Sequence, residues 1–156
     1  MTQCDEAIYR KMRRPIVYVM IGAPASGKST RAKSLQGRII SSDAIRAKLY
    51  GDESIQGNSA DVFTVFYSMA KIELAKGNDI ILDATNLTAK NRKNVFNNLK
   101  GYNCKYIAVV CFSPLETLLE RNRNRSRVVP EDVVTRMYKS FQEPSYEEGF
   151  DEIWRD

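Results

Sequence analysis

The stretch that decides the fold runs from Pro15 to Thr30 and reads PIVYVMIGAPASGKST. Its first half, residues 15–21, is a continuous apolar run, which is typical of a strand buried on both faces of a parallel sheet. The second half matches the pattern G-x-x-x-x-G-K-[ST] in full from Gly22 to Ser29. Because a buried strand precedes the pattern and a helical stretch follows it, we predict a phosphate-binding loop rather than a glycine-rich turn without a ligand.

The chemistry of such a loop requires these residue types at this spacing. The two glycines let the backbone N–H groups turn toward phosphate oxygens, and the helix N-terminus adds its positive end. Lys28 is expected to reach the β- and γ-phosphates, and the Ser29 hydroxyl is expected to ligate Mg²⁺. The predicted loop contacts to a nucleoside triphosphate are Gly22, Ala25, Ser26, Gly27, Lys28, Ser29 and Thr30. The loop alone does not separate a kinase from a GTPase or an ATPase.

The rest of the chain alternates between short apolar runs and stretches with helical periodicity. This alternation predicts a single α/β domain over residues 1–156, with helices on both faces of a central parallel sheet and a lid that carries arginines. The expected strands are residues 15–21, 38–40, 80–82 and 106–112. The expected helices run to about residue 35, over 44–50, 60–76 and 89–99, from 114, and over 131–141. The aromatic side chains of residues 60–76 are interpreted as core.

Ligands of open α/β sheets lie outside the carboxyl ends of the strands, so polar residues there are candidate site residues. Asp43 follows the second strand, and Arg46 comes three residues later on the next helix, so both can face one cleft. A carboxylate beside a guanidinium suits proton removal from a hydroxyl next to an anionic group. The alternative is that Asp43 only caps its helix.

Asp83 follows the third strand in the sequence Asp83-Ala84-Thr85-Asn86. A carboxylate at this position is expected to reach the Mg²⁺ hydration shell or to orient a neighbouring arginine. The alternative is an ordinary turn of Asp and Asn at the end of a strand.

Arginine occurs at every second position from Arg121 to Arg127. Arg121 and Arg125 are four residues apart and would share a helix face. We predict that residues 121–130 form a lid whose arginines stabilise charge on the transferred phosphate. A solvated basic helix end is the alternative.

Composition restricts the chemistry further. The 156 residues include no histidine, which excludes Ser-His-Asp and Cys-His catalysis and a histidine general base. The net charge is +5, which indicates an anionic partner, and it divides into a basic N-terminal lead (residues 1–14), a basic body and an acidic tail (residues 142–156). Three cysteines form no Cys-x-x-Cys pair, and no apolar run is long enough to span a membrane, so we expect a cytoplasmic protein without a membrane contact.

Four motifs in this order, SGKST, SSDAIR, LDATN and RNRNR followed by VVP, resemble the polynucleotide 5′-hydroxyl kinases of the P-loop phosphotransferase group. The resemblance covers roughly residues 16–150 and implies ATP as donor and a DNA or RNA 5′-hydroxyl end as acceptor. It implies catalytic roles for Lys28, Asp43, Arg46, Asp83 and Arg125. It further implies nucleotide contacts from Arg121 and Arg125 and a metal contact from Ser29; the other expected metal contact is Asp83, from its place at the end of a strand. Arg123 and Arg127 match no position of the family.

Two other functions stay open at this stage. A kinase of the same fold could act on a small molecule or on aminoacyl-tRNA, and acceptor choice would then depend on residues 50–67, which the sequence does not decode. A nucleotide switch or a non-catalytic module is the second alternative, but the chain lacks an Asn-Lys-x-Asp guanine-reading element and has both a base and a lid. The phosphatase signature Asp-x-Asp-x-Thr is also absent, so we expect either a stand-alone kinase or the kinase domain of a larger protein.

Overall fold

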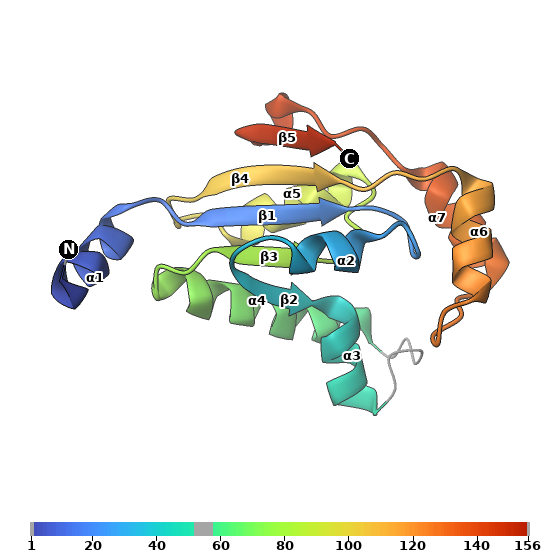
Figure 1. Cartoon of the computed structure of the whole chain (residues 1–156), viewed down its shortest axis with the longest axis horizontal. Helices are drawn as coiled ribbons and strands as arrows, with labels where there is room; N and C mark the ends of the chain where they lie inside the picture. The colour runs from blue at the N-terminus through green and yellow to red at the C-terminus, as the bar shows by residue number, and fades with distance from the viewer. Residues whose placement is uncertain (1, 52–57, 156) are drawn as a thin grey trace.

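A computed structural model describes residues 2–51 and 58–155 and has a five-stranded, fully parallel sheet at its centre. The strand order is β2-β3-β1-β4-β5, so the chain crosses over between neighbours rather than forming hairpins. All strands point the same way in Figure 1, and their carboxyl ends face α3, α6 and α7. The strands are β1 Ile16–Ile21, β2 Arg38–Ser41, β3 Ile80–Asp83, β4 Lys105–Val110 and β5 Glu152–Arg155. The predicted parallel α/β fold is therefore confirmed.

Helices cover both faces of the sheet, as predicted. Alternate residues of β1 face the two sides: Val17, Val19 and Ile21 pack in the core cluster that includes residues of α4 and α5, whereas Tyr18 and Met20 pack beside Ala32 of α2. The face of the sheet that carries Tyr18 and Met20 has the smaller helical cover, because α2 has only six residues. The helices are α1 Gln3–Met12, α2 Lys28–Lys33, α3 Ser42–Tyr50, α4 Ser59–Ala75, α5 Ala89–Asn98, α6 Leu115–Arg123 and α7 Glu131–Ser140, with a 3-10 turn, η1, at Tyr146–Glu148.

Three elements were missed by the sequence analysis. The N-terminal lead contains the helix α1, whose first turn is capped by reciprocal hydrogen bonds between Thr2 and Asp5. The acidic tail contains η1 and β5, and β5 pairs in parallel with β4 at the edge of the sheet. The tail is therefore a structural part of the sheet rather than an appendage.

Most of the aromatic stripe of α4 is core, as predicted: Phe66 and Tyr67 are buried and their rings pack edge to face, whereas Phe63 is half-buried. Burial raises the pKa of the Tyr67 phenol to about 12, so this group stays protonated near neutral pH. Part of the 50–67 region to which acceptor choice was assigned, residues 52–57, lies outside the described residues.

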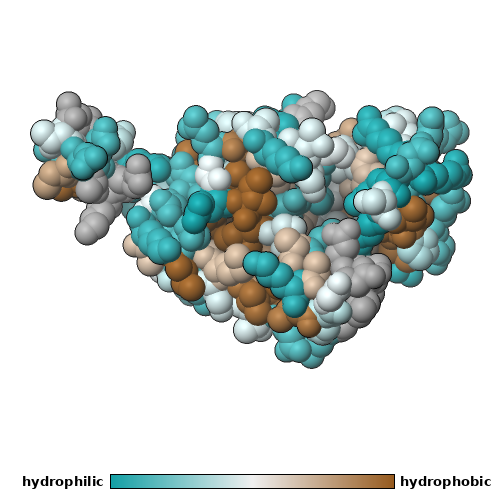
Figure 2. Space-filling view, turned by 60° about the horizontal axis from the view of Figure 1, so that its bottom comes forward, coloured by the Kyte–Doolittle hydropathy of each residue, from teal (hydrophilic) through white to brown (hydrophobic). Residues whose placement is uncertain are grey.

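The surface shows how apolar and charged side chains are distributed. Figure 2 shows apolar groups gathered over the middle of the body, whereas hydrophilic side chains dominate the end that carries α6. Exposed apolar residues on β2 and α4 include Ile39, Met69 and Ile72. In the described part of the chain, no helix has the length and apolar character needed to cross a bilayer.

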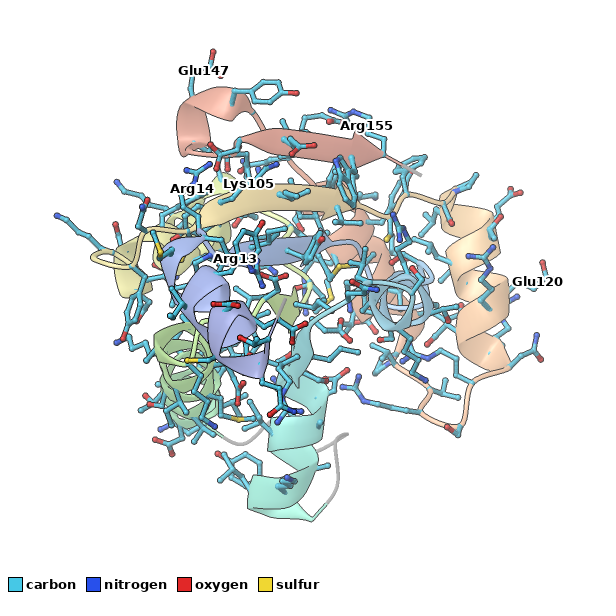
Figure 3. The ribbon with its side chains drawn as sticks, turned by 60° about the vertical axis from the view of Figure 1, so that its left-hand side comes forward. Arg13, Arg14, Lys105, Glu120, Glu147 and Arg155 are labelled. Atoms are coloured by element: carbon cyan, nitrogen blue, oxygen red, sulfur yellow. The ribbon has the colours of Figure 1, made fainter. Side chains whose placement is uncertain are left out.

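Part of the positive charge lies far from the carboxyl ends of the strands. Arg13, Arg14 and Lys105 lie at the amino ends of β1 and β4, at the opposite end of the body from Glu120 on α6 (Figure 3). Arg13 pairs with Asp79 at 2.9 Å, and Lys105 pairs with Glu152. One cation of the basic lead, Arg13, is therefore paired with an acid of the fold itself.

Candidate functional site

A cleft of about 860 Å³ opens at the carboxyl ends of the strands, between the phosphate loop, α3 and residues 121–130. This volume suits a nucleotide-sized ligand. Among the described residues, its lining includes one carboxylate, Asp43, and six cationic side chains. These cations are Lys28, Arg31, Arg46, Arg121, Arg125 and Arg127. The lining thus strongly favours an anion.

The phosphate loop has backbone geometry that explains its glycines. A Cβ on Gly22 would come within 2.8 Å of the Cys111 carbonyl oxygen, so no larger residue fits there. Gly27 has a φ of +89°, and Ala25 also lies in the left-handed region, with a φ of +68°. The Gly22 N–H donates to the Thr85 carbonyl at 3.0 Å, which ties the loop to the end of β3. The loop is therefore held in a curled shape by backbone contacts.

Asp83 lies beneath the loop and bonds two of its side chains. Lys28 Nζ donates to Asp83 Oδ1 at 2.9 Å, and Ser29 Oγ donates to Asp83 Oδ2 at 3.0 Å. The Lys28 and Asp83 side chains are 13% and 8% exposed. One hydroxyl and one carboxylate fit Mg²⁺, which takes few protein oxygens and completes its shell with phosphates and water. No group of three or more acidic or cysteine side chains suited to a metal occurs in residues 2–51 and 58–155.

Asp43 and Arg46 do face one cleft from α3. Arg46 Nη1 donates to Asp43 Oδ1 at 2.8 Å, and Arg46 is 8% exposed. Asp43 is not the helix cap, because Ser41 occupies that position and its hydroxyl accepts from the Ala44 N–H. The capping alternative for Asp43 is therefore wrong.

Residues 121–130, which we call the arginine segment, comprise the last turn of α6 and the connection to α7. Asn122 is fully buried and exchanges two hydrogen bonds with the backbone of Val129, at 2.6 and 3.0 Å, which fixes the two ends of the segment. Arg121 and Arg125 line the cleft, and Arg121 donates to Ser113 at 3.2 Å. Arg123 instead pairs with Glu131 at 2.7 Å and is exposed.

Arg127 is a candidate site residue that the sequence analysis missed. Its Nη1 donates to Asp43 Oδ2 at 3.1 Å, and its side chain is only 13% exposed. The two partners are 84 residues apart, so no local pattern indicates the pair. The alternation of arginines was the only available signal, and it does not distinguish Arg127 from Arg123.

Four buried polar atoms of the described residues have no hydrogen-bond partner, and all four belong to residues that line the cleft. A buried donor without an acceptor costs about 1–3 kcal/mol, so such atoms are rare outside ligand sites. The atoms are Ser26 Oγ, Arg46 Nε, Arg125 Nη1 and Arg127 Nε. Three of them are guanidinium donors, which indicates that the missing acceptor is anionic.

Comparisons with known proteins identify a matching family and relatives of similar fold. A family model described as an AAA domain, AAA_33, matches residues 17–144. The L-seryl-tRNA(Sec) kinase of Methanococcus maripaludis is 26% identical over 145 residues, 87% of this chain and 56% of that protein. The chain thus spans just over half the length of this relative.

Two solved structures share the fold. A chain of the Pnkp1/Rnl/Hen1 RNA repair complex superposes with a TM-score of 0.73 and 19% identity, covering 82% of this chain and 44% of that chain. A gluconokinase from Sinorhizobium meliloti gives a TM-score of 0.58 and 18% identity, with coverage of 92% and 83%. At these identities the likeness shows the fold alone.

Proposed function

The chain belongs to the AAA_33 family of AAA domains, and on this premise we propose that it is an ATP-dependent kinase acting on the 5′-hydroxyl end of a polynucleotide. The observation that carries this proposal is a juxtaposition. The carboxylate of Asp43 and three partly unpaired arginines face the same cleft as the phosphate loop. A base, an anion-binding group and a donor-binding loop are the parts that phosphoryl transfer needs.

On the donor side, the proposal assigns the triphosphate to the loop. The backbone N–H groups of Gly27–Thr30 would bind the β-phosphate region, and Lys28 would contact the γ-phosphate. Ser29 and Asp83 would hold Mg²⁺, which when bound neutralises charge on the phosphates. Arg121 and Arg125 would bind from the arginine segment, where the unpaired Nη1 of Arg125 supplies a donor for phosphate oxygen.

On the acceptor side, the proposal assigns proton removal to Asp43. The hydroxyl oxygen attacks the γ-phosphorus, the bond to the bridging oxygen of ADP breaks, and the hydroxyl proton passes to Asp43. Arg46 would hold the phosphate next to the attacked sugar, since its buried Nε has no protein acceptor. Phe63 of α4 also lines the cleft and could contact an acceptor base.

A second acceptor is favoured by a specific observation. The seryl-tRNA(Sec) kinase of M. maripaludis matches 87% of this chain, and aminoacyl-tRNA also offers a hydroxyl close to phosphates. The loop, the base and the arginines would keep the same roles with either acceptor. The two functions therefore differ only in the acceptor that is phosphorylated.

An acceptor screen with γ-labelled ATP tests the proposal. Oligonucleotides with a 5′-hydroxyl end, in DNA and RNA, are compared with seryl-tRNA, free nucleosides and gluconate at matched concentrations. We expect the label at the 5′ end of an oligonucleotide, and a clear preference for any other acceptor would overturn the polynucleotide assignment.

Asp43→Asn should lower kcat by about 10²–10⁴-fold. Asp61→Asn is the matched control, because Asp61 is an exposed acid in the first turn of α4.

A further inference from the structure

The carboxylate of Asp43 is bonded on both oxygens by guanidinium groups. Arg46 Nη1 lies 2.8 Å from Oδ1, and Arg127 Nη1 lies 3.1 Å from Oδ2. Arg46 is a helical neighbour of Asp43, whereas Arg127 reaches it from the arginine segment across the cleft. One of the two bonds is therefore local, and the other bridges the two sides of the cleft.

Arg127 is also incompletely bonded. Its Nε is buried without a hydrogen-bond partner, and its side chain lines the cleft at 13% exposure. A guanidinium has five donors in a fixed fork and suits two-point binding of a carboxylate or a phosphate. Its single short contact with Asp43 leaves that fork partly unused. An anion in the cleft would bind Arg127 side-on through Nε and Nη2, and would compete with Asp43 for this guanidinium.

We propose that the ion pair between Arg127 and Asp43, which we call the latch, blocks Asp43 until the acceptor binds. An anionic group of the acceptor would bind the guanidinium of Arg127 and break this ion pair. This inference rests on the proposed kinase function and assigns a specificity role to a residue that matches no family motif. While the latch is closed, Arg127 occupies Oδ2. When the acceptor's anion takes Arg127, Oδ2 becomes available to receive the hydroxyl proton as the oxygen attacks the γ-phosphorus and ADP leaves.

The latch selects acceptors by charge. An anionic acceptor exchanges one ion pair for another, so Arg127 is never left in the cleft without a counter-charge. A neutral acceptor must separate Arg127 from Asp43 without a replacement, and uncompensated buried charges are costly. The ion pair therefore acts against neutral hydroxyl compounds, including water, while it permits acceptors that carry a phosphate next to the hydroxyl.

The arginine segment holds Arg127 where this exchange can occur. The buried Asn122 and the Val129 backbone close the segment with two hydrogen bonds, so its two ends stay fixed when its arginines change partners. Arg123 lies on the same segment but pairs with Glu131, is exposed, and takes no part in the latch. It is the matched control for Arg127.

The test compares two acceptors that differ in one charge. Oligonucleotides with a 5′-hydroxyl carry either a normal first linkage or a neutral methylphosphonate there, and kcat/KM is measured for each. In the native protein the charged acceptor should be preferred. Arg127→Ala should reduce the preference by at least about tenfold, and Arg123→Ala should leave it unchanged. An unchanged preference in Arg127→Ala would overturn the latch. If that variant melts early, Arg127→Gln replaces it.

Hydrolysis of ATP without acceptor separates failure of the latch from failure of the proposed function. If the native protein phosphorylates neither oligonucleotide, the polynucleotide function fails, and the hydrolysis rate alone then decides on the latch. Freeing Asp43 should let it act on water, so Arg127→Ala should hydrolyse ATP several-fold faster than the native protein. A rate equal to or below the native one would then reject the latch.

Discussion

Buried arginines play opposite parts at two places in this molecule. Arg92 of α5 is fully buried, and its three nitrogen atoms are all bonded. It pairs with Glu148 at 2.7 Å and donates to the backbone carbonyls of Asn86, Leu87 and Glu143. The cleft arginines Arg46, Arg125 and Arg127 each keep a buried nitrogen without a partner.

The difference separates structural charge from charge kept for a ligand. Arg92 joins the end of β3 to the acidic tail, since Asn86 and Leu87 follow β3 and Glu148 lies in η1. All three guanidinium nitrogens of Arg92 are hydrogen-bonded to the protein. In the cleft, the fold leaves guanidinium donors without hydrogen bonds, which lowers its stability. A bound anion would supply the missing acceptors and restore that stability.

The largest expected effect is on Arg125. If its unpaired Nη1 serves phosphate in the transition state, Arg125→Ala should lower kcat by about 10³-fold or more. The free energy of unfolding should stay within about 0.5 kcal/mol of the native value, because no protein partner is lost. Labelled-ATP assays and urea denaturation measure the two quantities. A stability loss with normal kcat would make Arg125 a structural arginine like Arg92.

Arg92 should show the reverse pattern. Arg92→Leu removes the Arg92 donors from Glu148 and from three carbonyl oxygens, so the free energy of unfolding should fall by about 3–5 kcal/mol. Urea denaturation of the ligand-free protein measures this loss. Adding Glu148→Gln should recover part of it, because the uncompensated buried charge is then removed. Unchanged stability in Arg92→Leu would contradict the structural role.

The contacts of these arginines can be predicted from the sequence only where the partners lie close together along the chain. The loop from Gly22 to Ser29 is local, and its strand-loop-helix context was predicted and confirmed. Asp43 and Arg46 are three residues apart on a helix, so their pairing was also accessible to sequence reasoning. The roles assigned to these residues remain predictions.

The missed features depend on contacts between distant segments. The pairs Arg127–Asp43 and Arg92–Glu148 span 84 and 56 residues, and neither has a local signature. The strand β5 has four residues within an acidic tail, and it forms because β4 offers an open edge. By contrast, α1 had a readable signal, since Thr2 and Asp5 form a capping box.

The stabilisation that comes from the pair between Arg92 and Glu148 depends on pH. Burial raises the pKa of its carboxyl, but hydrogen bonds from Arg92 and Ser145 outweigh burial and hold the pKa below its ordinary value of 4.5. The stabilisation is therefore complete above pH 4.5 and is lost as the pH falls through the lowered pKa of the folded protein. Its loss should be smaller than that of Arg92→Leu, because the carbonyl contacts of Arg92 persist.

The measurement is the unfolding free energy from neutral pH to below pH 4. Glu148→Gln should flatten its dependence on pH in the acid range. Glu147→Gln is the matched control, since Glu147 is exposed and points away from the body in Figure 3. If the unfolding free energy of the two variants depended on pH in the same way, the stabilising contacts of Arg92 would not require the charge of Glu148.

Arg123 should have the smallest effect and completes the comparison, because it belongs to neither class. Its pair with Glu131 is short, at 2.7 Å, but the two side chains are 60% and 52% exposed. Water screens such a pair, so Arg123→Ala should change the free energy of unfolding by at most about 1 kcal/mol, and less in high salt. The variant should also leave kcat near the native value, because Arg123 does not line the cleft. A large fall in kcat would show that position in the arginine segment matters more than the unpaired donors, and the distinction between structural and ligand-binding arginines would then fail.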